Sequence, residues 1–380
     1  MLDNTIITIC GDLCPTNDTL SLFESINEAG LFNDVLPLLK KSDFVFGNLE
    51  FVLTKESVGV EKTGPILIGK PEFSSVFKKA GFDLLSLANN HIKDCGEDGV
   101  KSTMDTLEEN KLSHFGAGKN IEEAKRPYIT EINGLKIAFI AFAEQEFNCA
   151  SEKEYGANYF DPYEDLDFIE SVKKQVDFLF VIYHGGIEYY EYPSPLLQKK
   201  CRKFIDKGAD LVTCQHSHCI GTIENYKDKN IVYGQGNTIF GYREGDNSWN
   251  QGLILQLKVE NDILKMDYKG VTATKENGIL LMTEKESQIL KEEIEERSKK
   301  ITDPKFIEDS WLQFCIKKES LYLPQYLGLN RYFIHLNRWT NNKLVSFLFL
   351  KKYLRSSHNI MRCEAHNEVI QTILNRKLKV

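Results

Sequence analysis

The sequence has no apolar run long enough to cross a bilayer. A membrane-spanning helix needs about 20 consecutive apolar residues, and the apolar stretch at residues 345–350 is far shorter. No basic segment precedes the first apolar residues, so they predict a first β-strand and not a secretory signal peptide. We therefore expect a cytoplasmic protein.

The sequence also has no C-x-x-C pair, although it contains nine cysteines. An odd number of cysteines without paired spacing argues against a disulfide framework. Reduced thiols in a cytoplasmic protein are the simplest interpretation.

Acidic residues outnumber basic residues over most of the chain, and the net charge of the whole chain is −8. This balance gives no general sign of nucleic-acid binding. Residues 301–380 differ, with 13 basic and 6 acidic residues and many aromatics. They predict either a surface for an anionic glycan, nucleotide-linked precursor or membrane headgroup, or helices that pack their aromatics against the acidic remainder. We favour the packing interpretation.

Five short apolar runs each end in polar residues that can bind a metal. The runs are rich in β-branched and aromatic residues and are too short for helices, which predicts buried strands. Ligands of open α/β sheets bind outside the carboxyl ends of the strands. One crevice should therefore collect the polar residues that follow the runs: Asp12, Asn48, Glu50, Asn90, His91, His184, His216 and His218.

The runs alternate with helical patterns up to about residue 220, which predicts a layered α/β domain. Three further strands are expected at residues 230–240, 251–260 and 262–271, in antiparallel order, with a hairpin turn at Asn261–Asp262. A charged helix follows at residues 284–300, and more helices follow Pro304. We expect one domain over residues 1–275 and a helical C-terminal region, rich in aromatic residues and Lys/Arg, over residues 280–380.

The strand-end residues form a mixed nitrogen and oxygen donor set. Such a set suits Mn, Fe or Zn better than Mg or Ca. A single strand-end histidine is usually an ordinary polar residue, so the joint pattern carries the prediction. Six candidate ligands without cysteine indicate two divalent metal ions that share a carboxylate, and such a pair can clamp a phosphoryl group. The candidates are Asp12, Glu50, Asn90, His184, His216 and His218.

Several stretches resemble the CapA family of bacterial capsule and poly-γ-glutamate synthesis proteins. They are GDLCP (11–15), FGNLE (46–50) and residues 81–118, 183–212 and 215–240, and they cover most of residues 5–270. The family is similar in fold to the calcineurin-like metallophosphoesterases. The resemblance implies an α/β/β/α sandwich, to which the C-terminal region adds a helical appendage.

The resemblance also implies a role for each ligand. Asp12, Glu50 and His218 would hold one metal, and Glu50, Asn90, His184 and His216 would hold the other, with Glu50 as the bridge. His91 would protonate the leaving group, a role that suits an imidazole.

Two positions depart from the phosphoesterase pattern. Cys14 stands where the usual D-x-H motif has a histidine, and Asn48-Leu49-Glu50 replaces the usual bridging aspartate motif. The first metal therefore has one standard ligand fewer. Cys14 could supply a thiolate, but we favour a buried small hydrophobe.

Four further residues are candidates for substrate binding. Glu188 and Tyr189 either contact substrate or orient His184. Lys62 could bind an anionic group, although a solvated surface lysine is the favoured interpretation. Asn237 could reach the rim of the site, but such an asparagine is more often a turn residue.

The function expected from these features is metal-dependent hydrolysis of a phosphomonoester or phosphodiester in capsule or cell-surface polysaccharide biosynthesis. The expected substrate is a phosphorylated sugar, glycerol or glycan precursor, on the resemblance alone. The alternatives are a poly-γ-glutamate amide hydrolase or transferase and a non-catalytic scaffold of a capsule-synthesis complex. Expected partners are membrane-associated polysaccharide-synthesis proteins, and no nucleic acid.

Overall fold

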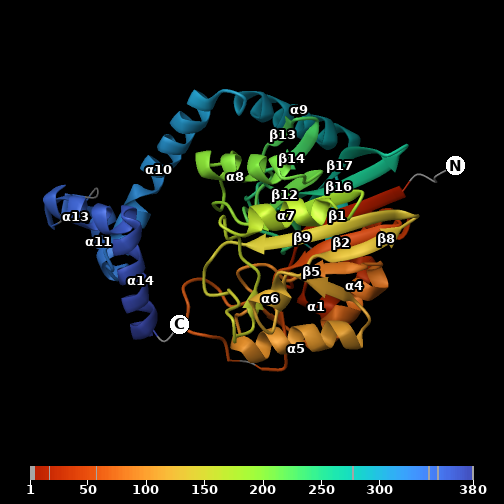
Figure 1. Ribbon diagram of the computed structural model, residues 1–380, viewed down its shortest axis with the longest axis horizontal. Coiled ribbons are helices and arrows are strands. Elements are labelled where there is room, and N and C mark those ends of the chain that lie inside the picture. Colours follow the sequence, from red (N-terminus) through yellow and green to blue (C-terminus); the bar gives the residue numbers. More distant parts are fainter. Residues whose placement is uncertain are drawn as a thin grey trace. The chain divides into compact units, whose positions relative to one another are not determined.

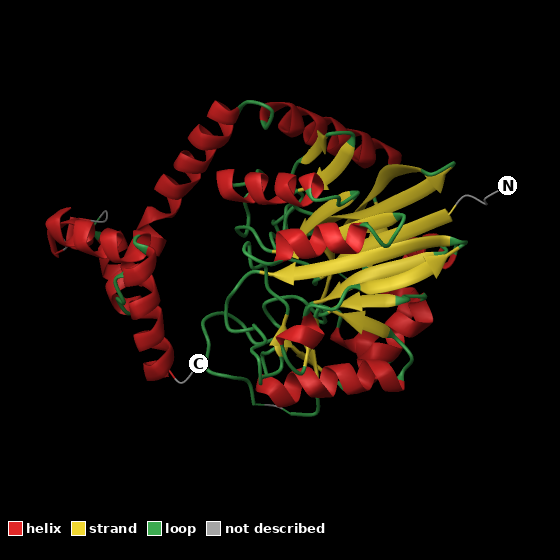
Figure 2. Cartoon of the chain, in the orientation of Figure 1, coloured by secondary structure: helices red, strands yellow, loops and turns green. Residues whose placement is uncertain are grey.

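The computed structural model describes residues 5–16, 18–56, 58–275, 278–340, 343–348 and 351–378. The chain divides into two compact units, Met1–Ile307 and Glu308–Val380. Figures 1 and 2 show strands and covering helices in the first unit and helices alone in the second. Each unit is described by itself.

The first unit contains two large sheets. The first sheet has β1 (Thr5–Leu13) near its centre. On one side lie the parallel strands β2 (Phe44–Leu49), β5 (Leu84–Ser86) and β6 (Ser113–Phe115). On the other side lie the antiparallel strands β16 (Gln251–Glu260), β17 (Ile263–Ala273) and β18 (Ile279–Leu281), and β15 (Asn237–Ile239) pairs with β1 in parallel.

The second sheet is built around four parallel strands. These are β9 (Leu135–Ala143), β11 (Phe178–His184), β12 (Leu211–Gln215) and β14 (Lys229–Val232). The antiparallel strands β8 (Tyr128–Ile132) and β13 (Ile223–Tyr226) form its edges. Two small sheets, β3 (Val52–Leu53) with β4 (Ile68–Gly69) and β7 (Ala117–Gly118) with β10 (Gly156–Ala157), lie outside both.

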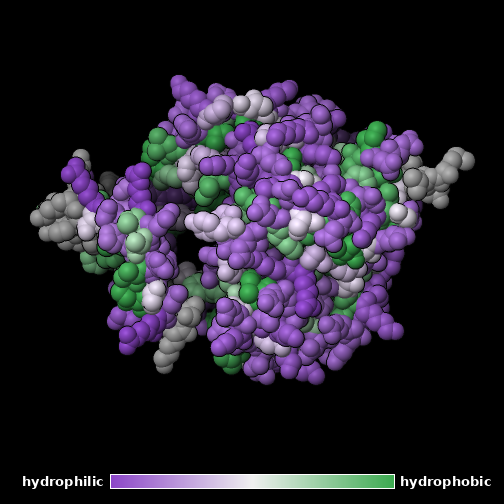
Figure 3. All heavy atoms as spheres, in the orientation of Figure 1, coloured by the Kyte–Doolittle hydropathy of each residue, from purple (hydrophilic) through white to green (hydrophobic). Residues whose placement is uncertain are grey.

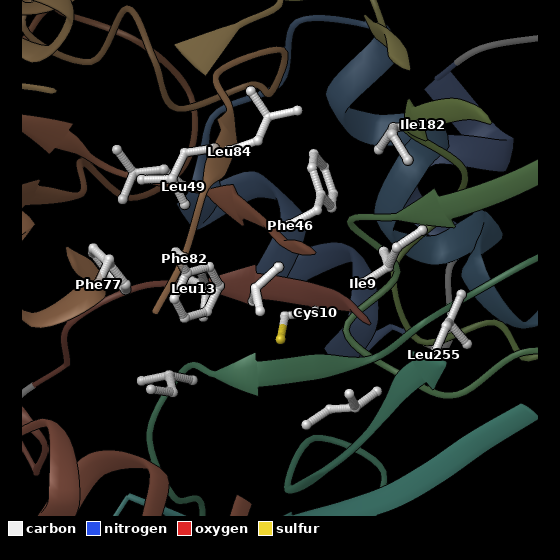
Figure 4. Packing of buried hydrophobic residues seen from close by; sticks show 14 of the residues in the cluster. Ile9, Cys10, Leu13, Phe46, Leu49, Phe77, Phe82, Leu84, Ile182 and Leu255 are labelled. Carbon is white, nitrogen blue, oxygen red and sulfur yellow. The ribbon is translucent and has the colours of Figure 1, made fainter. Parts of the chain in front are cut away.

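An apolar layer joins the two large sheets face to face. The Phe139 ring of the second sheet stacks at 5.5 Å on Phe44 and at 5.7 Å on Phe46 of the first sheet. Ile9, Phe46 and Ile182 belong to this layer, which Figure 4 shows from close by. Burial of such side chains is the main favourable term in folding, so this layer holds the two sheets together.

Helices cover the outer face of each sheet. The first sheet is covered by α1 (Leu20–Glu24), α2 (Glu28–Phe32), η1 (Asn33–Val35), α3 (Leu36–Lys40), η2 (Pro71–Phe73), α4 (Ser74–Ala80) and α5 (Gly96–Glu109). The second sheet is covered by α7 (Asp165–Lys173) and α8 (Pro195–Asp206), and α6 (Ile121–Ala124) is a short connecting helix. The order helix, sheet, sheet, helix confirms the predicted sandwich.

The prediction for residues 230–240 was wrong. This segment does not form one continuous strand. It divides between β14, which pairs in parallel with β12 and antiparallel with β13, and β15, which pairs in parallel with β1; it meets residues 251–260 in an antiparallel bridge between Gly236 and Gly252. The crossing needs a left-handed backbone, and Gly236 supplies it with φ +69°. The buried side-chain amide of Gln235 donates to the backbone carbonyls of Ile9 in β1 and Leu253 in β16, and these bonds tie the crossing segment to both strands. The predicted hairpin of β16 and β17, which turns at Asn261–Asp262, is confirmed.

The charged helix α9 (Glu284–Lys300) belongs to the first unit, whereas the prediction placed it in the C-terminal region. A capping box of Thr283 and Glu286 starts it, and Leu290 and Ile294 bury its apolar side in the core. The chain then continues through α10 (Pro304–Tyr326), α11 (Arg331–Trp339), α12 (Lys343–Leu348), α13 (Lys351–Arg362) and α14 (Glu364–Leu378).

The visible surface is mainly hydrophilic (Figure 3). Among the described residues, no helix combines the length and the apolar character that a bilayer span requires.

Candidate metal centre

Two strands from each large sheet end at the same edge of the sandwich. Register places Asp12 of β1 beside Asn48 of β2, and His184 of β11 beside Gln215 of β12. Across the sheets, His184 Nε2 lies 3.5 Å from Glu50 Oε1, and His184 Nδ1 lies 3.8 Å from Asp12 Oδ1. The expected convergence of these strand ends is therefore present, but it joins two sheets and not one.

The candidate ligands form two overlapping groups. In one group, donor atoms of Asp12, Glu50 and His218 all lie within 4.8 Å of one another. In the other, donor atoms of Glu50, His184 and His216 do so. The amide oxygen of Asn90 lies 3.0 Å from His184 Nε2 and adds a fourth donor to the second group. All six predicted ligands are thus gathered, and Glu50 is common to both groups.

The Glu50 carboxylate has the surroundings that a bridging ligand requires. Both of its oxygens are buried, and neither has a hydrogen-bond partner among the described residues. A buried carboxylate without a partner is strongly unfavourable unless a cation compensates it. Nδ1 of the buried His216 likewise lacks a partner within the described chain. The residues present therefore fit a pair of divalent cations.

Burial shifts the pKa of each group toward its neutral form. Burial raises the pKa of Asp12 to about 6 and raises that of Glu50 well above its ordinary value. It lowers the pKa of His184 and His218, and it lowers that of His216 furthest. Neutral imidazoles are the form that binds metals. The carboxyl groups must release protons when a metal binds, so binding is coupled to pH.

The backbone turns sharply to bring His216 and His218 into the site. Both residues have positive φ, 93° and 51°, in the region that side chains other than glycine rarely occupy. The His216 N–H donates to Asp12 Oδ2 over 3.0 Å, which holds this strained turn in place. Strain of this kind gathers at functional sites.

A chain of buried amides supports the ligands from behind. Asn48 Nδ2 donates to Asp12 Oδ1 over 2.8 Å and lies 3.1 Å from His184 Nδ1. Asn89 donates to the Asn48 side-chain oxygen and accepts from the His91 backbone N–H. Sequence reasoning missed the role of Asn89, although its place beside Asn90 and His91 was a usable signal.

His91 faces the two groups and is held by an acidic partner. Its Nε2 lies 4.0 Å from Glu50 Oε1, and its Nδ1 lies 2.8 Å from Asp94 Oδ2. Burial lowers the pKa of His91, and the Asp94 bond opposes that shift. Asp94 therefore fixes the orientation of the imidazole.

The sequence matches the model of the family described as "Bacterial capsule synthesis protein PGA_cap" over residues 6–242. The chain belongs to the PGA_cap family. It is 30% identical over 254 residues to "Capsule biosynthesis protein CapA" of Bacillus anthracis. The aligned region covers 64% of this chain and 61% of that protein. It is 29% identical over 245 residues to "PGA biosynthesis protein CapA" of Bacillus subtilis, with 63% of each chain covered. The chain thus spans less than two thirds of these relatives.

Solved structures also resemble this PGA_cap protein. A hypothetical protein from Thermus thermophilus covers 73% of this chain and all of its own, with a TM-score of 0.47 and 13% identity. A 5'-nucleotidase precursor from the same organism covers 84% of this chain and 59% of its own, with a TM-score of 0.40 and 15% identity. Similarity at this level carries no argument about function.

The side chain of Lys62 is buried in this PGA_cap protein, contrary to the favoured interpretation of a solvated lysine. This side chain is 3% exposed, forms an ion pair with Asp94 and lies 3.3 Å from His91 Nδ1. Asp94 also accepts from the Leu67 backbone N–H, so it ties residues 62–67 to the site. Lys62 therefore stabilises Asp94, the residue that holds the His91 ring, and its ammonium group is already paired with that carboxylate.

The other candidates for substrate binding divide between support and surface. Asn237 Oδ1 lies 2.8 Å from His218 Nδ1, and Asn237 Nδ2 donates to the Trp249 carbonyl, so this residue orients a ligand. Glu188 and Tyr189 lie exposed on the loop after β11. Neither residue has a hydrogen bond to His184 among the described contacts, which favours the interpretation that they contact substrate over the one that they orient His184.

Cys14 is fully buried just beyond the end of β1. Burial raises the pKa of its thiol well above the ordinary value, which keeps the sulfur protonated. Among the described residues, it joins neither of the two ligand groups. This placement favours the buried small hydrophobe over a thiolate ligand.

Proposed function

We propose that the protein is a dinuclear-metal hydrolase that acts in the synthesis of a capsule or related cell-surface polymer. The observation that carries this proposal is the Glu50 carboxylate, buried without a hydrogen-bond partner among the described residues and shared by two ligand groups. The nitrogen and oxygen donors suit Mn, Fe or Zn. When bound, two such cations would supply the positive charge that stabilises a phosphoryl transition state.

The protein's own residues would position and protonate the reacting groups. His91 would donate its Nε2 proton to the departing oxygen, while Asp94 holds Nδ1 and fixes the ring. Asn48 would keep Asp12 and His184 in their ligand orientations. Burial of the carboxylate and imidazole ligands, all less than a tenth exposed, would keep bulk water from weakening these interactions.

We propose phosphoester hydrolysis as the reaction, with a phosphorylated sugar, glycerol or glycan precursor as substrate. Spread negative charge on a phosphoryl group matches two shared cations. A second candidate is hydrolysis or transfer at a γ-glutamyl amide, which the name of the Bacillus subtilis relative favours. A third is a scaffold without catalysis, contacting membrane-associated polysaccharide-synthesis proteins, which the missing histidine at Cys14 favours.

One experiment separates the three. Protein loaded with Mn, Fe or Zn and checked by elemental analysis is assayed with a broad phosphoester panel and with γ-glutamyl peptides. We expect phosphoester hydrolysis that a chelator abolishes. Cleavage of γ-glutamyl peptides alone would support the amide reaction, and inertness toward both together with co-purification of polysaccharide-synthesis proteins would support the scaffold.

The role of His91 can be tested by its substitution with asparagine. We expect His91→Asn to keep metal binding but to lower turnover of alkyl phosphates by roughly 10²–10⁴-fold, the usual loss for a general acid. Aryl phosphates with good leaving groups should lose much less, because their departure needs no proton. The exposed His358 offers a matched control, since His358→Asn should change neither rate. Equal losses for both substrate classes would contradict the acid role.

A further inference from the structure

A solvent-exposed arginine lies on the face of a tryptophan next to the metal centre. The guanidinium carbon of Arg243 lies 3.0 Å from the centroid of the Trp249 ring. That ring lies 4.7 Å from the ring of His218, one of the candidate ligands. Arg243 also donates from Nη1 to the Tyr189 hydroxyl over 3.1 Å. The three side chains form a cluster, the Arg243–Tyr189–Trp249 cluster, at the rim of the site.

Buried residues hold the loop that carries Arg243 through several hydrogen bonds. Asn250 accepts from the Arg243 N–H over 2.8 Å and donates to the Arg243 carbonyl over 2.7 Å. Trp249 is only 3% exposed, and its indole N–H donates to the Gly241 carbonyl. The Asp246 carboxylate accepts from the Trp249 backbone N–H. The backbone around the arginine is therefore ordered before any ligand binds, which lowers the entropic cost of binding.

Tyr189 is fixed from the other side. Its backbone N–H donates to the carbonyl of Ser217, the residue between His216 and His218. Its φ is +60°, so the chain accepts backbone strain to place this side chain. The residue is 41% exposed, and its ring stacks on Trp249 with the ring centroids 6.3 Å apart. The loop that delivers two metal ligands thus also anchors the rim cluster.

The guanidinium retains capacity for an anionic ligand. It carries five N–H donors, and within the described part of the chain its one hydrogen bond goes to Tyr189. No carboxylate of the described residues forms an ion pair with it; the nearby Glu244 pairs instead with Lys275 at 3.8 Å. Stacking on an aromatic face orients the planar donor fork, which matches the two oxygens of a carboxylate or phosphate.

We propose that the Arg243–Tyr189–Trp249 cluster is a subsite for an anionic oxygen group, a carboxylate or a phosphate, on a substrate whose reacting bond lies at the metal centre. The inference rests on the proposed function and deepens it. The substrate then carries at least two polar groups, one at the metals and one at Arg243. A γ-linked glutamate chain would offer a carboxylate there, and a phosphorylated precursor would offer a second phosphate.

Equilibrium binding tests this subsite without any turnover. Chelated, metal-free protein is titrated by calorimetry with a γ-linked glutamate pentamer and, separately, with glycerol phosphate. We expect Arg243→Gln to weaken binding of the recognised probe about tenfold or more, the size of one lost charge-assisted hydrogen bond. Arg243→Lys should recover only part of the affinity, because lysine keeps the charge but loses the planar fork. The probe that responds identifies the source of the anion.

Arg126→Gln is the matched control, since it removes one exposed arginine from elsewhere on the first unit. It should leave the affinity of both probes within about twofold, because a solvent-exposed charge acts weakly at a distance. Binding of a probe at Arg243 should change the fluorescence of the indole of Trp249, on which the guanidinium lies, and Trp249→Phe should remove that change. Equal effects of Arg243→Gln and Arg126→Gln would overturn the subsite, as would the absence of saturable binding of either probe by the wild-type protein.

The subsite and the hydrolase can fail separately. Hydrolysis by metal-loaded protein combined with unchanged probe binding in Arg243→Gln would overturn the subsite and leave the hydrolase standing. Inert metal-loaded protein that nevertheless loses probe affinity on Arg243→Gln would overturn the hydrolase and support the subsite.

Discussion

The two ligand groups of the candidate metal centre share Glu50 but differ in their remaining donors. One group adds His184, His216 and the oxygen of Asn90, so four donors surround its centre. The other adds only Asp12 and His218, and the position at which phosphoesterases carry a further histidine holds the buried thiol of Cys14. The first of these groups is rich in imidazole and complete, whereas the second is acidic and lacks one donor.

Two ligand groups that are equally buried can therefore differ in their affinity for a metal ion. Four donors can satisfy a divalent transition metal, whereas three leave an open position for water or substrate. We therefore expect the imidazole-rich group to bind metal tightly and the acidic group to bind it more weakly. The weaker ion would then be the one whose occupancy controls activity.

Loss of the shared carboxylate should have the largest effect. Glu50→Gln removes the charge that both groups need, so we expect both metals to be lost. The loss of affinity should exceed the roughly 10–100-fold change that supporting residues produce. Elemental analysis after gel filtration measures the stoichiometry. Glu188→Gln is the control, because Glu188 is an exposed acid near the site, and retention of two metals in Glu50→Gln would contradict a bridge.

The two histidines of the H-x-H segment should separate the two groups. His216→Ala should remove the tightly bound metal, whereas His218→Ala should leave one tight equivalent and remove the weaker one. Calorimetric titration with Mn or Zn measures both affinities. The two variants are matched to each other, since both remove one imidazole from the same strained turn. Identical titration curves would show that the groups do not bind independently.

Substitution of Asp12 should stabilise the metal-free protein at neutral pH. Burial raises the pKa of Asp12 from 3.8 to about 6, so the folded state binds this proton more tightly than the unfolded state. Ionisation of Asp12 therefore lowers the free energy of unfolding progressively between about pH 4 and pH 6. Above pH 6, Asp12→Asn should raise that free energy by up to about 3 kcal/mol, and below pH 4 the difference should vanish.

Urea unfolding of metal-free protein across this pH range checks the prediction. Asp206→Asn is a suitable comparison, because ion pairing with Lys227 lowers the pKa of Asp206 and its contribution has the opposite sign. A constant difference between Asp12→Asn and the wild type over the whole range would contradict the assigned shift.

The smallest effect is expected at Cys14. If the thiol only fills space, Cys14→Ala should lower the free energy of unfolding by about 1 kcal/mol, as for the loss of one small buried group. Metal affinity should stay unchanged. A selective loss of the weaker metal would show that the sulfur is a ligand and that the acidic group has four donors after all. Cys10→Ala, at another buried cysteine of β1, provides the matched control.

Much of the sandwich and the convergence of the candidate ligands were predictable because the signals are local. Each strand end presents its polar residue directly after a buried apolar run, as Asp12 and His184 show. The division of residues 230–240 between two sheets was not predictable in this way. It depends on a left-handed Gly236 and on the partners of the Gln235 amide, which come from β1 and β16.

The supporting residues were harder to predict than the ligands. Nothing in the spacing of Lys62 from Asp94 shows that the ammonium is buried, because that depends on how residues 62–67 fold back over the site. Arg243 and Trp249 were missed for the same reason. Their relation to Tyr189 joins segments more than fifty residues apart through side-chain stacking, which leaves no periodic trace in the sequence.

The delivery of ligands from both sheets has a consequence for how the protein matures. Neither β1 and β2 alone nor β11 and β12 alone can form either ligand group, so no partly assembled chain holds the complete site. Long-range pairings of this kind form late during folding. Any metal uptake at this site would then follow the docking of the two sheets, and we expect a newly made chain to bind no ion here before its core has closed.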